Sequence, residues 1–347
     1  MAIEAMKKYF EEVENVDIRN IEVTLGSKDL SILYNGKALK KYDCIYAKGS
    51  FRYAPLLRSL STAYYDNIYM PIKPNAFTIG HDKLLTHLAL QYHKIPMPDT
   101  YIVSSIDAAK KILGQVKYPI VLKFPHGTQG KGVMFADSFA AASSMLDAIE
   151  TLRQPFLIQE YVETEDSDIR AFVVGDKVIA AMRRKAVFGE KRANIHAGAK
   201  GESIVLDNHT KKIAIKTAKA IGAEICAVDI LESVRGPEVI EANLSPGIRG
   251  ITEVTQVDVA DKIAKYLFKR SKETIEKGKD TEADKMIAKL QVKESGKDDS
   301  EQQIVSNLDF RGDRMLLPKI ITDITNLDEG TEIVIKAKKG KVSIEKF

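Results

Sequence analysis

Two apolar runs that flank a Gly-Pro break in residues 225–244 most constrain the fold of this 347-residue chain. Glycine and proline interrupt apolar runs at turns, so the pair predicts a β-hairpin. If the chain reverses near Arg235, Asp229 lies directly opposite Glu241 on the neighbouring strand. Asn243 shares the face of Glu241, because side chains two residues apart on a strand point the same way. Three oxygen donors would then converge on one patch.

Such a patch has the chemistry of a divalent metal site. It contains no histidine or cysteine, and hard oxygen donors at incomplete valence suit Mg²⁺, which completes its shell with water and nucleotide phosphates. Mn²⁺ accepts similar oxygen ligands. The alternative is an ordinary exposed hairpin face that carries two acids and an amide. The hairpin alone does not decide between the two.

The composition excludes several classes of protein. Apolar residues make up 44% and charged residues 29% of the chain, as in ordinary globular proteins, and a net charge of +4 does not indicate a dedicated nucleic-acid or membrane-surface protein. No apolar run approaches the ~20 residues that span a bilayer, and the N-terminus lacks a signal-peptide core. Cys44 and Cys226 lie in apolar stretches, which predicts buried free thiols and a cytoplasmic location.

The length and the changes in composition predict a multidomain chain of mixed α/β and α+β structure. Residues 1–77 have the pattern of a small α/β domain, and residues 78–270 alternate helical and strand-like segments. Residues 271–304 are rich in Lys, Glu, Asp and Ser, which predicts a charged, solvated or disordered linker with room for one short helix near 283–290. Short strands return in residues 305–347 and predict a separate small β-rich module.

A glycine-rich segment between two strand-like runs, at residues 119–135, is a candidate for phosphate binding. Gly127, Gly130 and Gly132 would let backbone amides approach phosphate oxygens, and Lys123 just before them could reach an α- or β-phosphate. A Walker loop or a dinucleotide fingerprint would open a helix, whereas a strand follows here. A β-hairpin lid over a nucleotide fits better, with a simple turn as the alternative.

Two further places could contact a nucleotide. Lys83 opens a helical stretch and could present a second cation, although a lysine on an amphipathic helix is most often simply solvated. Glu160, Tyr161 and Val162 end a buried strand, where backbone groups and the Glu160 carboxylate could meet an adenine edge. Plain strand termination explains the same pattern.

A polar loop before the acidic hairpin adds a cation and an amide. Arg192 offers a planar donor fork suited to phosphate, and Asn194 could bind metal or phosphate. His196 follows in the same loop and fits either a substrate contact or an ordinary loop histidine.

The ordered series of motifs resembles the RimK-like branch of the ATP-grasp superfamily, the ATP-dependent α-glutamate and related amino-acid ligases. The resemblance is collinear over residues 78–268 and rests on HDK, LKFPHGTQGKGV, QEYVE, DIR, RANIH, VDIL and EANLSPG. It implies a short pre-ATP-grasp α/β domain at 1–77 and a two-lobed ATP-grasp fold at 78–270, whose α+β lobes hold ATP between them.

The resemblance also implies a role for each candidate residue. Those expected to contact ATP are Lys83, Lys123 and the loop glycines for the phosphates, Glu160, Tyr161 and Val162 for the adenine, and Asp168 of the DIR motif for the ribose or nucleotide edge. Those expected at the reacting end are Arg192 and Asn194 for the terminal phosphates, with Asp229, Glu241 and Asn243 for two Mg²⁺ ions.

The implied reaction is ATP-dependent carboxylate–amine ligation through an acyl phosphate. It would form ADP and add glutamate or a related amino acid to a carboxylate acceptor, which could be a small molecule, a cofactor tail or a carrier protein. One departure concerns the substrate side, because Ala197-Gly198-Ala199 stands where the family commonly has Arg-Gly-Gly. Arg249 is a candidate replacement for the missing carboxylate-binding cation.

The segment 308–332 is similar to AbrB-like swapped-hairpin domains. An R-x-x-L-P strand end and an L-x-E-G-x-E turn carry this similarity. Such modules dimerise and many bind DNA, so a homodimer or higher oligomer is expected, and an ATP-sensing DNA-binding regulator is the alternative function. The complete metal trio and both lysines favour catalysis, because sensing could tolerate their loss.

Overall fold

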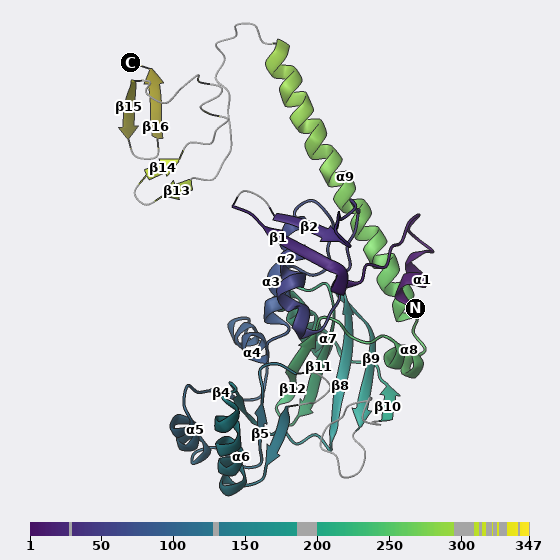
Figure 1. The fold of residues 1–347 in the computed structure, drawn as a ribbon, viewed down its shortest axis with the longest axis vertical. Helices are drawn as coiled ribbons and strands as arrows, with labels where there is room; N and C mark the ends of the chain where they lie inside the picture. The colour runs from purple at the N-terminus through teal and green to yellow at the C-terminus, as the bar shows by residue number, and fades with distance from the viewer. Residues whose placement is uncertain are drawn as a thin grey trace. The chain divides into compact units, whose positions relative to one another are not determined.

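The computed structural model of the chain describes residues 1–27, 30–127, 132–185, 200–294, 309–311, 314–316, 321, 325, 332–338 and 341–346. The chain divides into two compact units, Met1–Glu282 and Ala283–Phe347 (Figure 1). Within the described ranges, none of the helices combines the length and the apolar character that crossing a membrane requires.

The N-terminal part of the first unit combines a small antiparallel sheet with short helices. The sheet has the order β1-β2-β3, formed by Ile21–Leu25, Leu30–Tyr34 and Lys37–Ala38. The helices are α1 (Ala2–Met6), α2 (Ala54–Tyr64) and α3 (Pro74–Ile79), with 3₁₀ turns at Ile18–Asn20 and Phe51–Tyr53. Proline in the first turn of α2 and of α3 favours these helix starts, because that turn has no partner for an amide hydrogen.

A four-stranded antiparallel sheet with two helices forms the middle of this unit. Its order is β4-β7-β5-β6, formed by Thr100–Ile102, Leu157–Glu160, Ile120–Lys123 and Val133–Ala136. The helices α5 (Ile106–Leu113) and α6 (Phe139–Leu152) lie side by side next to this sheet (Figure 1) and share its apolar core. Each begins after a serine, Ser105 or Ser138, whose hydroxyl accepts a hydrogen bond from a first-turn amide.

A five-stranded antiparallel sheet provides most of the remaining framework. Its order is β10-β9-β8-β11-β12, formed by Lys200–Ser203, Lys177–Lys185, Ser167–Val174, Ile225–Ser233 and Gly236–Asn243. The helix α7 (Asn208–Ile221) packs on it, α4 (Lys83–Tyr92) contacts α7 and β12, and α8 (Arg249–Thr255) lies beside β9 and β10. The sequence also predicts a hairpin over 169–182 with a tight Gly175-Asp176 turn, and the pairing of β8 with β9 confirms it.

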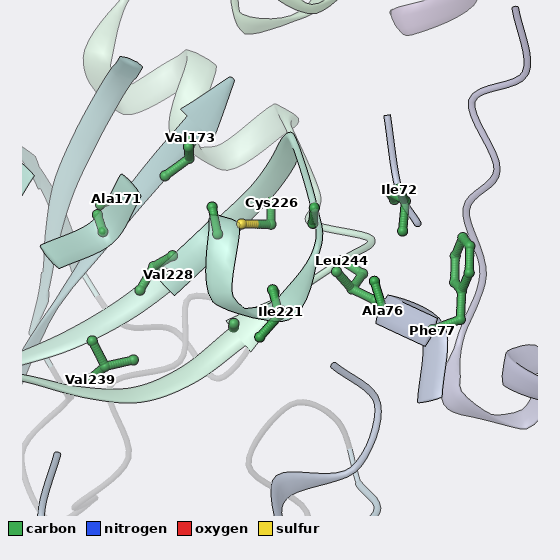
Figure 2. Packing of buried hydrophobic residues seen from close by; sticks show 14 of the residues in the cluster. Ile72, Ala76, Phe77, Ala171, Val173, Ile221, Cys226, Val228, Val239 and Leu244 are labelled. Carbon is green, nitrogen blue, oxygen red and sulfur yellow. The ribbon is translucent and has the colours of Figure 1, made fainter. Parts of the chain in front are cut away.

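The largest core joins the N-terminal elements to the five-stranded sheet. Figure 2 shows Ile72, Ala76 and Phe77 in one cluster with Cys226 and Val228 of β11. Residues on both sides of position 77 therefore share one apolar core. Cys226 and Cys44 are both free cysteines, as predicted; Cys226 is buried as expected, whereas Cys44 is half-buried.

The charged segment after residue 270 differs from its prediction. The sequence predicts a solvated or disordered linker over 271–304, preceded by a helix over 259–268, whereas helix α9 runs from Val259 to Glu294. Lys, Glu and Ala favour helix as strongly as they favour solvation, so this composition also suits an exposed helix. Lys269 and Arg270 pair with Glu273 at i, i+4 and i, i+3, which adds local support.

The second unit contains two antiparallel hairpins within its described residues. Asp309–Arg311 (β13) pairs with Arg314–Leu316 (β14), and Ile333–Lys338 (β15) pairs with Lys341–Lys346 (β16). Short strands were predicted for this region. Its AbrB-like character, its dimerisation and its binding of nucleic acid stay predictions.

Candidate active site

A cavity of about 650 Å³ in the first unit contains most of the described candidate residues. Most of its wall comes from three places in the fold. The four-stranded sheet contributes Val121, Lys123, Val133, Phe135 and Gln159; the five-stranded sheet contributes Asp168, Arg170, Arg184, Asp229, Glu241 and Asn243; and the N-terminal part contributes Lys48, Gly49, Ser50 and Phe51.

The β11–β12 hairpin places Asp229 directly opposite Glu241, as predicted. The turn that leads to this pairing is not centred where the sequence predicted. Ser233 pairs with Gly236, so the turn lies half a residue before the predicted centre, and a plain hairpin would put Ile240 opposite Asp229. A register shift between Asp229 and the next residue leaves Ile240 as the extra residue of a β-bulge. The bulge therefore brings Ile240, Glu241 and Asn243 all to the cavity wall.

Asp229 is the centre of a buried network of charges. Its Oδ1 accepts from Arg170 Nε at 2.8 Å, and its Oδ2 accepts from Arg170 Nη2 at 2.7 Å and lies 2.9 Å from Arg184 Nη2. Arg184 also binds Asp168 through two bonds of 2.6 Å. Burial alone would raise the pKa of Asp229, but Arg170 and Arg184 outweigh burial and lower the pKa to about 2.

These contacts determine which oxygens of the predicted metal trio can still bind a metal ion. In the part of the chain that the structure describes, no three His, Cys, Asp or Glu side chains gather as a metal cluster. Asp229 uses three of its about four acceptor positions on arginine, which leaves one at Oδ1. The Glu241 carboxylate forms no hydrogen bond or ion pair with any described residue, and Asn243 Oδ1 accepts only the Ser245 amide, at 2.9 Å, which leaves one acceptor position. Hard oxygens with acceptor positions to spare suit Mg²⁺.

Lys123 is held by a buried hydrogen-bonded chain. Its Nζ donates to Gln159 Oε1, and Gln159 Nε2 lies 2.8 Å from both His87 Nε2 and Thr100 Oγ1. His87 Nδ1 lies 2.6 Å from the Lys83 carbonyl oxygen, so the ring donates there and accepts from Gln159. Burial lowers the pKa of His87 to about 4, which keeps the ring neutral and the chain of donors consistent.

Lys83 and the glycine hairpin lie beside this chain. Lys83 Nζ donates to the Gly127 carbonyl oxygen at 3.2 Å, and both residues line the cavity. Gly132 closes the hairpin, since its carbonyl oxygen accepts from the Phe124 amide at 3.0 Å. Its φ of +77° and the 2.8 Å approach of Phe124 to the position of a Cβ both require glycine. Two cations without acidic partners among the described residues thus flank a glycine-rich turn.

Comparison with known proteins decides the family. A model of the RimK-like ATP-grasp domain matches residues 80–267. The chain belongs to the RimK-like ATP-grasp family. A protein of Vibrio cholerae named probable alpha-L-glutamate ligase is 36% identical over 285 residues, which is 80% of this chain and 94% of that protein. One of Methanococcoides burtonii with the same name is 35% identical over 276 residues, 78% of this chain and 91% of that protein.

Solved structures show the same ATP-grasp fold. The ATP-grasp ligase PsnB, solved with a minimal precursor, Mg and ADP, superposes with a TM-score of 0.61 at 18% identity and covers 78% of this chain and 93% of its own. D-alanine–D-alanine ligase from Bacillus anthracis gives 0.53 at 19% identity, with 69% and 83% covered. The predicted ATP-grasp fold is confirmed at the level of an α+β architecture.

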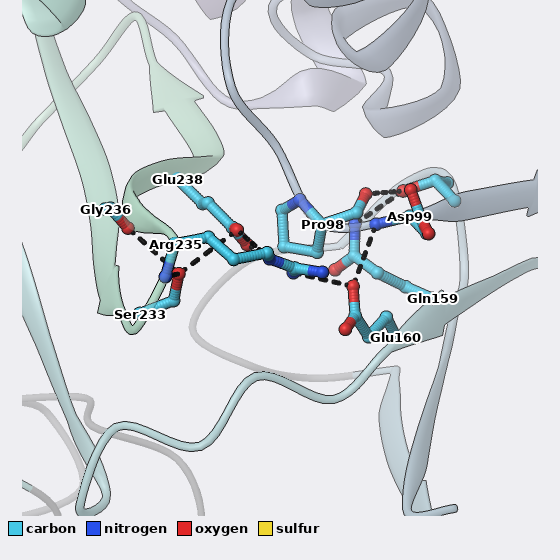
Figure 3. Close-up of polar contacts among 9 residues, drawn as sticks. Pro98, Asp99, Gln159, Glu160, Ser233, Arg235, Gly236 and Glu238 are labelled. Atoms are coloured by element: carbon cyan, nitrogen blue, oxygen red, sulfur yellow. Dashed lines mark hydrogen bonds and ion pairs between the residues drawn. The ribbon is translucent and has the colours of Figure 1, made fainter. Parts of the chain in front are cut away.

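The adenine candidates divide into an apolar surface on the cavity wall and a paired carboxylate. Tyr161 and Phe135 meet edge to face at 6.0 Å, and both line the cavity together with Val162. The Glu160 carboxylate accepts from Arg235 Nη2 at 2.8 Å, and Arg235 also binds Glu238 (Figure 3). Arg235 therefore competes for the carboxylate that the sequence offered to adenine.

Some predicted site residues lie outside the described part of the chain, and the cavity also contains residues that were not predicted. Gly130, Arg192, Asn194 and His196 lie outside the described residues. Asp168 lines the cavity, but both its oxygens are bound to Arg184. The sequence prediction missed the cavity residues Lys48, Gln159, Arg170 and Arg184. Arg170 two residues after Asp168 was the available signal, because it shares that strand face and lies opposite Asp229 in the register.

Proposed function

We propose that this ATP-grasp chain is an ADP-forming carboxylate–amine ligase that uses ATP and Mg²⁺ and adds glutamate or a related amino acid to a carboxylate acceptor. One observation carries the proposal: Lys83 and Lys123, without acidic partners in the described structure, share a cavity with the unpaired Glu241 carboxylate and the remaining acceptor position of Asn243 Oδ1. Cations for phosphate and hard oxygens for metal are what a nucleotide–Mg²⁺ site needs. The names of the relatives from Vibrio cholerae and Methanococcoides burtonii support the ligase reaction.

The cavity residues divide the work of binding ATP. The apolar wall of Val121, Phe135, Tyr161 and Val162 would receive the adenine ring, and Asp168 would lie at the nucleotide edge. Lys83 and Lys123 would neutralise phosphate oxygens under the glycine hairpin, with Gln159 and His87 fixing the direction of the Lys123 ammonium. Arg192 and Asn194 are proposed for the terminal phosphates on motif grounds alone.

The metal would lie at the hairpin of β11 and β12. Glu241, Asn243 and the remaining acceptor position of Asp229 Oδ1 would hold it. Bound Mg²⁺ would neutralise charge on the transferred phosphoryl group. The arginines on Asp229 keep its carboxylate ionised and fixed in direction.

The reaction then proceeds in two displacements. An oxygen of the acceptor carboxylate attacks the γ-phosphorus, the bond from that phosphorus to the bridging oxygen breaks, and ADP leaves. The amine nitrogen of the amino acid attacks the acyl carbon, the bond to the phosphate oxygen breaks, and the nitrogen loses its extra proton to water. The products are an amide, ADP and phosphate. The described residues contribute alignment and charge neutralisation to both steps.

The titration of Lys123 predicts that the affinity for ATP depends on pH. Burial lowers the pKa of Lys123 to about 8; Glu241 opposes this shift and Lys83 adds to it. Phosphates favour the ammonium form, so above pH 8 binding of ATP must be accompanied by uptake of a proton. Just below about pH 7.5 the dissociation constant of ATP should change little with pH. Above pH 8 it should rise by up to about tenfold per pH unit. Calorimetry in two buffers of different ionisation enthalpy measures both the constant and the proton uptake.

The matched control for this pH effect is Lys123→Arg. Arginine stays charged throughout this pH range, so the variant should lose both the proton uptake and the pH dependence. A wild-type dissociation constant that stays level to about pH 9.5 would show that Lys123 does not face the phosphates.

A product assay tests the proposed function. The full chain is incubated with ATP, Mg²⁺, a panel of amino acids that includes L-glutamate, and a panel of carboxylate acceptors, and ADP and new masses are measured together. We expect ADP to form in step with an amide product. ATP binding without turnover on any pair, or formation of AMP and pyrophosphate, would refute the proposal.

A further inference from the structure

Lys48 lies on the cavity wall in a segment that is tied to the end of β12. Gly49, the next residue, donates its amide to Ser245 Oγ at 2.9 Å, and Lys48 Nζ donates to the Pro246 carbonyl oxygen at 3.1 Å. A Cβ at Gly49 would lie only 3.0 Å from Leu57 Cδ1, so glycine permits this close approach. The position of the Lys48 ammonium is therefore set by the turn that follows Asn243.

Lys48 differs from the other cations of the cavity because it neither pairs with a described acidic residue nor belongs to the proposed phosphate site. Arg170 and Arg184 are neutralised by buried aspartates, and Lys83 and Lys123 flank the glycine hairpin. No acidic side chain of the described ranges forms an ion pair with Lys48. Among the described residues, Lys48 Nζ contacts the Pro246 carbonyl oxygen and the Tyr46 ring, whose centroid is 5.5 Å from Nζ.

The surroundings of Lys48 favour an incoming anion. Burial lowers its pKa, which measures the cost of holding a charge without a counter-ion, while the Tyr46 ring favours the charged form. Lys48 is half-buried, and a cation withdrawn from water is ordinarily paired, so an anionic ligand in the cavity would provide that pair.

The place of Lys48 identifies the class of anion. Asn243 Oδ1 accepts from the Ser245 amide, so the Lys48 segment and the proposed metal ligand share one turn. The acceptor carboxylate must reach the γ-phosphorus beside that metal to react. Arg249, the cation predicted from sequence for a substrate carboxylate, instead begins α8 and is not among the residues that line the cavity.

We propose that Lys48 binds a carboxylate of the carboxylate acceptor, the substrate that becomes the acyl phosphate, and so selects acidic acceptors. This inference rests on the proposed function, because it assigns the substrate side of the same cavity. Lys48 would hold the acceptor through a charge-assisted hydrogen bond beside Asn243, apart from the phosphates at Lys83 and Lys123.

Glutarate is a suitable probe because it carries two carboxylates and no amine. Its binding to the full chain saturated with ADP and Mg²⁺ is measured by calorimetry, with the uncharged glutaramide as the reference ligand. We expect Lys48→Met to weaken glutarate binding at least tenfold, and Lys48→Arg to stay within about threefold of the wild type, since arginine keeps the charge. Lys37→Met on exposed β3 is the matched control and should bind as the wild type does.

The possible results distinguish a failure of the role proposed for Lys48 from a failure of the proposed ligase function. Unchanged glutarate binding in Lys48→Met, or a wild type that prefers glutarate no more than glutaramide, would overturn the role of Lys48 alone. Equal losses of ATP and glutarate affinity in Lys48→Met would overturn it too, because the ammonium would then serve the nucleotide. A wild type that does not bind ATP with Mg²⁺ would overturn both proposals.

Discussion

Replacing Glu241 by Gln should slow ADP formation by orders of magnitude while leaving the protein folded. The carboxylate has no described hydrogen bond or ion pair to lose, so the change removes charge from the cavity and little else. Loss of a metal ligand at the phosphoryl-transfer site should reduce kcat by about 10²–10³-fold, the range measured when one transition-state partner is removed. Initial rates of ADP formation at saturating Mg²⁺ measure the effect.

Glu232→Gln is the matched control for Glu241→Gln. Glu232 lies in the same hairpin but pairs with Arg183 outside the cavity wall, so its loss should leave kcat within about twofold. Thermal unfolding should be unchanged within a few degrees in both variants. Activity of Glu241→Gln close to that of the wild type would mean that Glu241 is not a metal ligand.

Replacing Asp229 by Asn should instead cost stability. Asp229 is 3% exposed, and its two oxygens neutralise Arg170 and Arg184. The amide leaves Arg170 without a carboxylate in the described structure, although Arg184 keeps Asp168. Breaking a buried ion pair from one side costs about 3–5 kcal/mol, because the remaining charge is left uncompensated. The free energy of unfolding from urea titration measures this loss.

Two variants show whether the loss comes from the unpaired arginine. Asp166→Asn makes the same chemical change on the cavity wall at a residue without a described ion pair, and should cost less than about 1 kcal/mol. Adding Arg170→Met to Asp229→Asn removes the stranded charge and should restore part of the stability. A loss below about 1 kcal/mol for Asp229→Asn alone would contradict the buried network.

The sequence predicted local features of the fold well where one physical signal dominated. The sequence predicts helices over 106–113 and 139–152, and α5 and α6 have these bounds, each with a serine at its N-cap. Asp229 was placed opposite Glu241 from an assumed turn centre, and the bulge at Ile240 compensated for a half-residue error in that centre. Helix α9 was missed beyond Phe268, since a charged composition is shared by linkers and exposed helices.

The partners of the site residues could not be predicted from local pattern. Arg184 reaches Asp168 and Asp229 only through the register of β8 with β9 and with β11. His87 reads as one more residue of an amphipathic helix until Gln159, 72 positions later, lies against it. Lys48 belongs to a segment that the sequence left without a role, and it meets the site through Ser245 and Pro246, almost 200 positions away.

If a substrate carboxylate becomes an acyl phosphate in this cavity, one of its oxygens leaves with the phosphate, and labelling with oxygen-18 follows that oxygen. The full chain is incubated with ATP, Mg²⁺, L-glutamate and acceptors whose carboxylates carry ¹⁸O, and the phosphate that is released is analysed by mass spectrometry. Attack on the γ-phosphorus transfers one carboxylate oxygen, so the phosphate should carry one ¹⁸O atom for each amide formed. Phosphate that contains only oxygen from ATP and water would contradict the account.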